Sequence, residues 1–179
     1  AAPSDEQIQE RIQEIVHPAT LAQVNYFHRL GLRERMLSFV VMVAFVLEMI
    51  WRQIGSVSAL TRLVQKEAVL WEQPRKVSQQ ALSQRLANLP SELFLRVLLD
   101  ILPLMRERWM ERERPLSPEL VWAAERYRAV LAVDGSTLDA LIRKMGLLQD
   151  LPENPLAGRM TALLDLCTRL PEQIWYEND

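Results

Sequence analysis

Apolar side chains recur at helical spacing through the first two thirds of the chain. Ile8, Ile12 and Ile15 are separated by four and three residues, so they share one face of a helix. This spacing predicts an amphipathic helix over residues 5–16, and Pro18 is expected to end it because proline breaks the hydrogen-bond pattern of a helix interior.

The same periodicity predicts four more helices, over residues 36–52, 56–66, 78–87 and 91–110. Ser56 or Ser58 is a suitable N-cap for the second of these and Ser78 for the third. The intervening residues 67–77 contain a proline and are interpreted as a connector. The eleven-residue run at 37–47, apolar except for Ser38, falls short of the ~20 residues that a membrane-spanning helix needs. It therefore predicts a buried helix and no contact with a membrane.

The pattern changes in the last third of the chain. Residues 127–133 are short, apolar and partly β-branched, which predicts a buried strand that ends at Asp134-Gly135. A helix is expected over residues 138–145. Residues 160–168 and 173–176 predict two further strands, joined as a hairpin over a loop of four or five residues.

The predicted fold class is therefore α+β, with two domains. Residues 1–125 form a helical N-terminal domain, and residues 126–179 begin a sheet domain. Three strands and one helix cannot cover both faces of a sheet. The expectation is that the 179 residues end inside a domain.

Charge and cysteine content narrow the function classes. The single cysteine excludes an intramolecular disulfide framework and a cysteine-based zinc site, and it favours a cytoplasmic protein. Residues 28–130 hold 16 Lys and Arg against 11 Asp and Glu, whereas the flanking segments are acidic. A basic middle segment is suited to phosphate-bearing partners.

Two helices in this basic segment are candidates for DNA binding. Residues 56–66 and 78–87 resemble a helix-turn-helix pair, although the connector is long for that motif. The candidate contacts lie in the second helix and just before it, namely Arg75, Lys76, Gln79, Gln80, Ser83, Gln84 and Arg85. Gln and Arg side chains can read adenine and guanine edges through paired hydrogen bonds. The alternative is a solvent-facing amphipathic helix that covers a bundle.

Asp134 is the candidate residue for metal binding and catalysis. It follows an apolar strand where the pattern offers no solvated face, and a buried carboxylate is costly unless it is paired or binds a metal ion. The alternative is an aspartate that caps an Asp-Gly turn.

The segment Ala132-Val-Asp-Gly-Ser-Thr-Leu-Asp139 resembles the first catalytic-aspartate motif of DDE transposases of the insertion-sequence-four type. Residues 158–171 resemble the strand pair that follows this motif in the family. Residues 45–52, 55–60 and 77–86 resemble the helical region that precedes it. The likeness covers about residues 30–179.

This resemblance implies an RNase H-like catalytic domain in which three carboxylates hold Mg²⁺ for strand cleavage and transfer at the ends of an element. Asp134 matches the first of the three. The matching second Asp and the Glu would lie beyond Asp179, so the resemblance implies that this chain alone is inactive.

The expected partner is DNA, with a possible homodimer and an association with the bacterial nucleoid. Two other function classes stay open. One is a non-catalytic DNA-binding regulator or inhibitor, which would bind DNA without a metal requirement. The other is a helical protein-interaction module, whose binding would not fall steeply with salt.

Overall fold

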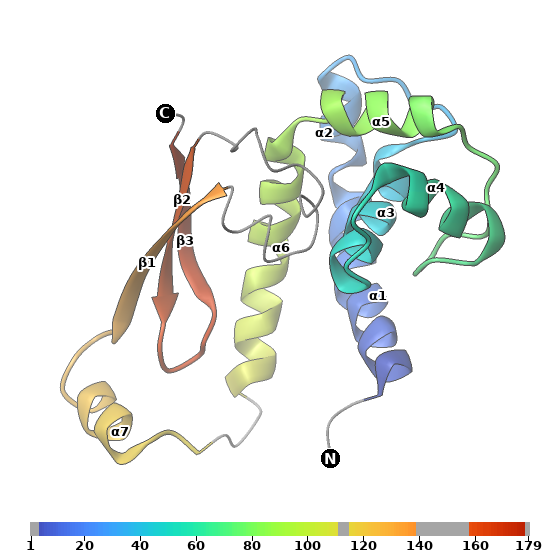
Figure 1. Ribbon diagram of the computed structural model, residues 1–179. Coiled ribbons are helices and arrows are strands. Elements are labelled where there is room, and N and C mark those ends of the chain that lie inside the picture. Colours follow the sequence, from blue (N-terminus) through green and yellow to red (C-terminus); the bar gives the residue numbers. More distant parts are fainter. Residues whose placement is uncertain (1–3, 111–114, 139–157, 178–179) are drawn as a thin grey trace. The chain divides into compact units, whose positions relative to one another are not determined.

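The computed structural model describes residues 4–110, 115–138 and 158–177 (Figure 1). These residues form a mixed α+β protein, which confirms the predicted fold class at that level. The described elements in chain order are α1 (Asp5–Ala22), α2 (Val24–Arg29), α3 (Phe39–Trp51), α4 (Val57–Lys66), α5 (Gln79–Asn88), α6 (Ser91–Met110), α7 (Pro118–Ala124), β1 (Leu131–Thr137), β2 (Arg159–Asp165) and β3 (Pro171–Glu177).

The chain divides into two compact units, Ala1–Ile101 and Leu102–Asp179, and the division falls within α6. The predicted functional boundary near residue 125 stays a prediction. None of the helices in the described ranges combines the length and apolar character that crossing a membrane requires.

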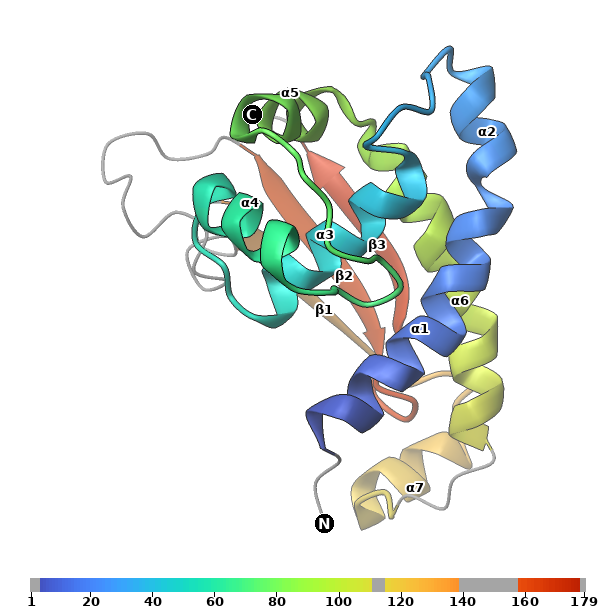
Figure 2. The ribbon, with the colours of Figure 1, turned by 90° about the vertical axis from the view of Figure 1, so that its right-hand side faces the viewer.

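Helix α3 is the centre of the first unit. It lies between α1 and α2 on one side and α4 and α5 on the other (Figure 2). Phe39 and Val43 pack into the cluster toward α1, α2 and α6, whereas Met42 and Phe45 pack into the cluster toward α4 and α5. A helix that is apolar on all sides is stable only when it is buried on all sides, and this explains the apolar run at residues 37–47.

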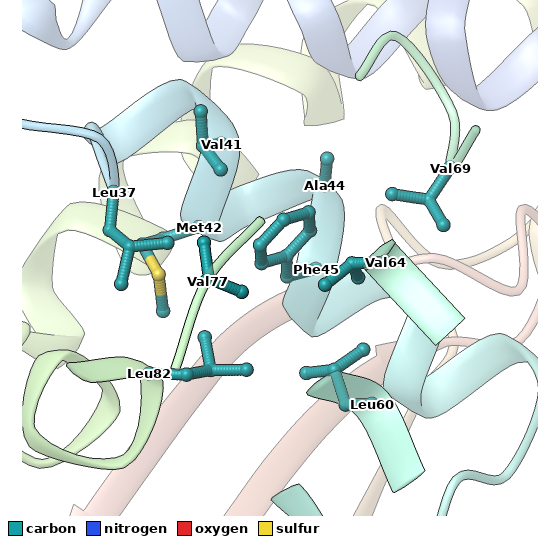
Figure 3. Close-up of a cluster of buried hydrophobic side chains, with 10 residues drawn as sticks. All are labelled: Leu37, Val41, Met42, Ala44, Phe45, Leu60, Val64, Val69, Val77 and Leu82. Carbon is teal, nitrogen blue, oxygen red and sulfur yellow. The ribbon is translucent and has the colours of Figure 1, made fainter. Parts of the chain in front are cut away.

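The cluster toward α4 and α5 joins residues from three helices, from the connector and from the loop before α3. Figure 3 shows its ten buried members, Leu37, Val41, Met42, Ala44, Phe45, Leu60, Val64, Val69, Val77 and Leu82. Because one cluster contacts α3, α4 and α5, packing in the core fixes the position of both candidate DNA-binding helices.

One buried charge lies at the end of α3. Glu48 is 1% exposed and forms an ion pair with Arg52 one turn later. A guanidinium nitrogen of Arg52 also lies 3.0 Å from a carboxylate oxygen of Glu67, which follows α4. Arg52 therefore connects the end of α3 to the end of α4.

The first helix is longer than predicted. It continues through Pro18 to Ala22, so the prediction of an end at His17-Pro18 is wrong. Ala19 and Thr20 are buried, and the Thr20 hydroxyl donates to the carbonyl of Val16 at 2.7 Å. Burial of the last turn thus holds the helix together after the proline, because tertiary packing supplies most of the stability of a helix in a protein.

The second unit holds a three-stranded antiparallel sheet with the strand order β1-β2-β3. Strands β2 and β3 form the predicted hairpin, and residues 166–170 connect them. The predicted helix over 138–145 lies outside the described residues from position 139 onward. Arg106, near the end of α6, pairs with Glu172 of β3 at 2.9 Å.

Among the described residues of the second unit, Gly158 has the conformation that most requires glycine. Its φ is +108°, and a Cβ there would lie 2.8 Å from the Tyr176 hydroxyl oxygen and 2.9 Å from the Glu177 carbonyl oxygen. Gly158→Ala is therefore expected to destabilise the second unit by about 2 kcal/mol, measured by urea unfolding. Gly135→Ala is the matched control, since its Cβ would meet Thr161 Oγ1 at an ordinary 3.6 Å. Equal losses in the two variants would contradict this geometry.

Candidate nucleic-acid interface

Helices α4 and α5 form the candidate DNA-binding pair. Each begins at a serine whose hydroxyl accepts a backbone N–H, from Ala59 to Ser56 and from Ala81 to Ser78, both at 3.1 Å. The bounds of the two helices agree with the predicted ranges to within about one residue. Helix α4 packs on the core through Leu60 and Val64.

The connector between the two helices is fixed by hydrogen bonds. The Gln65 side-chain amide donates to the carbonyl of Val77 at 2.7 Å, and the backbone N–H of Arg75 donates to the carbonyl of Val64 at 2.7 Å. Val69 and Glu72 exchange two backbone hydrogen bonds of 2.9 Å. The long connector is therefore folded back against α4 and holds the start of α5 in a defined position.

Five of the seven predicted contact residues present exposed side chains at α5 and its start: Lys76, Gln79, Gln80, Ser83 and Gln84. Gln80 and Gln84 are four residues apart, so they are neighbours on one face of the helix. The structure thus places these side chains together on a solvent-facing surface, where they can reach a partner.

The other two predicted contact residues, Arg75 and Arg85, are half-buried and donate to backbone carbonyls. Arg85 Nε donates to Leu37 at 2.9 Å and Arg85 Nη2 donates to Arg33 at 3.1 Å. Arg75 Nη1 donates to Met36 at 2.5 Å. Both side chains therefore hold the loop of residues 32–38, which precedes α3, through hydrogen bonds to its carbonyls.

The surroundings of Arg85 are apolar and positive. Its guanidinium carbon lies 5.1 Å from the centroid of the Phe27 ring. Burial first, and the positive charge of Arg35 second, lower the pKa of the Arg85 guanidinium. An arginine stays protonated despite such a shift, so this region concentrates positive charge.

Arg33 and Arg35 are not among the contact residues predicted from the sequence. Both are exposed in the loop held by Arg75 and Arg85. The signal in the sequence was two arginines in a polar segment between two apolar ones, and nothing in that pattern relates them to a helix about fifty positions later. Only the fold brings them to α5.

Asp134 lies within β1, directly opposite Ala162 of β2. The prediction that the strand ends at Asp134-Gly135 is wrong, because β1 continues to Thr137. The Asp134 side chain is also exposed rather than buried. Its strand begins at Leu131, and Leu131 and Val133 are exposed as well.

A Mg²⁺ site needs several oxygen ligands in fixed positions. Among the residues that the structure describes, no group of three Asp, Glu, His or Cys side chains is placed to hold a metal ion. Asp134 offers one carboxylate, which does not by itself make a two-metal centre.

The comparisons with known proteins leave the family open. Neither the protein-family models, nor the curated proteins, nor the solved structures contain a match to this chain.

Proposed function

We propose that this chain binds duplex DNA through α5 and the residues just before it. The observation that carries the proposal is the exposed polar face of α5. The core and the hydrogen-bonded connector hold this helix in a fixed position. Gln79, Gln80 and Gln84 supply groups that can pair with base edges in the major groove. Lys76 lies at the start of the helix, where a phosphate is favoured.

We further propose that the chain is the N-terminal portion of a DDE transposase of the insertion-sequence-four type. Asp134 lies on the first strand of an antiparallel sheet, and the predicted hairpin follows it in the strand order β1-β2-β3. We propose that this sheet is the start of an RNase H-like domain. In the complete domain Asp134 would be the first of three carboxylates that hold Mg²⁺.

Salt dependence tests the DNA-binding proposal. Binding of this chain to a mixed duplex library is measured by selection and by fluorescence anisotropy at two salt concentrations. The expected result is sequence-selective binding that weakens steeply with salt, because each neutralised phosphate releases counterions. Absence of binding at low salt, or affinity that does not change with salt, would show that α5 is a scaffold or a protein-contact surface.

Replacing one glutamine tests the role of α5. Gln84→Ala is expected to weaken binding to the preferred duplex about 5- to 100-fold, since a good bidentate base contact contributes about 1–3 kcal/mol. Binding to unrelated duplexes should hardly change. Gln13→Ala is the matched control, because Gln13 is an exposed helical glutamine in α1. Equal effects of the two variants would remove α5 from the interface.

Strand cleavage tests the transposase proposal separately. A chain extended beyond Asp179 is expected to nick element-end DNA only with Mg²⁺, and Asp134→Asn in that chain should abolish nicking while leaving DNA binding unchanged. Nicking that survives Asp134→Asn would exclude this residue from the catalytic site. Selective binding without any nicking by the extended chain would favour a non-catalytic regulator.

A further inference from the structure

The loop of residues 32–38, which we call the arginine loop, joins α2 to α3 and is held against α5. Three of its carbonyls accept hydrogen bonds from Arg75 and Arg85. Side chains of α5 and the connector thus fix the backbone of a segment that lies some forty to fifty positions earlier in the sequence.

The arginine loop carries two exposed cations beside α5. Arg85 donates to the carbonyls of Arg33 and Leu37, so the loop that carries Arg35 lies against Arg85. Within the described residues, no carboxylate forms an ion pair with Arg33, Arg35 or Lys76. These three cations therefore keep their charge available for a partner.

Two carboxylates lie in the same region, and each has another partner. Glu34 is 3.7 Å from His28 Nε2, and Glu72 is 3.0 Å from Arg75 Nη2. The local charge stays positive because four cations lie in this region against these two acids. The four are Arg33, Arg35, Lys76 and Arg85. Exposed arginines with no acidic partner are suited to phosphate oxygens, which the guanidinium group binds in a bidentate manner.

We propose that the arginine loop is a second DNA contact, in which Arg33 and Arg35 bind backbone phosphates beside the groove that α5 enters. Arg75 and Arg85 are positioning residues that hold the loop and do not read bases. This inference rests on the proposed function, because it assigns the phosphate contacts of the same interface. Phosphate contacts of this kind set register and affinity, while base contacts set sequence preference.

The slope of log affinity against log salt concentration tests the arginine loop. Arg33→Gln and Arg35→Gln are each expected to lower the slope by about 0.9, and the double variant by about 2, with the preferred sequence unchanged. Arg11→Gln is the control, since Arg11 is an exposed arginine in α1 that pairs with Glu14. Thermal unfolding of each variant verifies that the fold is intact.

The outcomes separate the two proposals. If the unmodified chain fails to bind DNA, the proposed function fails. If it binds DNA with α5-dependent selectivity and the double variant keeps the full salt slope, only the role of the arginine loop is overturned. A changed sequence preference in the double variant would also overturn it, since phosphate contacts carry no direct base information.

Arg85→Lys tests the positioning role. Lysine keeps the charge but lacks the planar fork that donates to two carbonyls at once. The expected result is a salt slope lowered toward that of the double variant, together with faster amide exchange in residues 33–37 and an unchanged preferred sequence. A full slope with unchanged exchange would show that Arg85 does not hold the loop.

Discussion

Replacing Phe45 with alanine is expected to lower the free energy of unfolding of the first unit by about 3–5 kcal/mol. Phe45 is fully buried among residues of α3, α4, α5 and the connector (Figure 3). The loss combines the transfer free energy of the ring with the cost of the cavity that remains. It is a large part of the ~5–15 kcal/mol that stabilises a typical domain.

Urea unfolding followed by circular dichroism measures this loss. Phe45→Leu is the matched control and should cost less than about 1.5 kcal/mol, because it keeps most of the buried apolar volume. DNA binding by Phe45→Ala should fall in proportion to the unfolded fraction and recover on cooling toward the temperature of maximum stability. A loss of less than about 1 kcal/mol for Phe45→Ala would show that the core does not depend on this ring.

Replacing Arg52 with methionine is expected to destabilise the first unit by about 2–4 kcal/mol at pH 7. Methionine keeps an apolar stem but removes the charge that faces Glu48. Glu48 is buried, and apart from the ion pair with Arg52 its carboxylate oxygens have no hydrogen-bond partner among the described residues. Without Arg52, this carboxylate would be a buried negative charge with no positive partner.

The loss should depend on pH in a defined direction. Burial raises the pKa of Glu48 above its ordinary value of 4.5, the charge of Arg52 lowers it, and Glu67 raises it slightly. With a raised native pKa, the folded state holds a proton that the unfolded state has released. Stability therefore falls as the pH rises from about 4.5 through the native pKa of Glu48. Removing Arg52 raises that pKa further, so the fall extends to higher pH.

Unfolding at pH 5 and pH 7 tests this prediction. Arg52→Met should lose less stability at pH 5 than at pH 7, and Glu48→Gln with Arg52→Met should recover most of the loss at pH 7. Glu67→Gln is the control, because Glu67 is exposed and such a pair contributes at most about 1 kcal/mol. A double variant as unstable as Arg52→Met alone would show that the charge of Glu48 is not the cause.

Helix starts could be predicted from the sequence because the signals are local. Ser56 and Ser78 each precede a segment whose apolar residues recur at helical spacing. Each accepts the backbone hydrogen bond expected of an N-cap. The end of α1 could not be predicted this way. Pro18 is a local stop signal, and burial of Ala19 and Thr20 against other helices overrides it.

The candidate site was predictable only in part. The polar positions of α5 recur at helical spacing, so an exposed face that carries Gln79, Gln80 and Gln84 could be predicted. The carbonyls that accept from Arg85 belong to a loop about fifty positions away, and no local pattern reveals them. Whether Asp134 is exposed likewise depends on which elements cover β1. The seven residues of the strand do not reveal this, because it is a property of the whole fold.

The packing of α5 also has a consequence for how the helix responds to a partner. All of α5 lies in the described range, and Leu82 is its one buried residue. Leu86 also packs on the core and Arg85 donates to two loop carbonyls. A helix with one fully buried side chain nevertheless opens at lower free energy than α3, which buries seven residues. The exposed turns of α5 can therefore open while Leu82 keeps the helix in place on the core. Its amide exchange should be fast in the free protein and slow once a groove covers it.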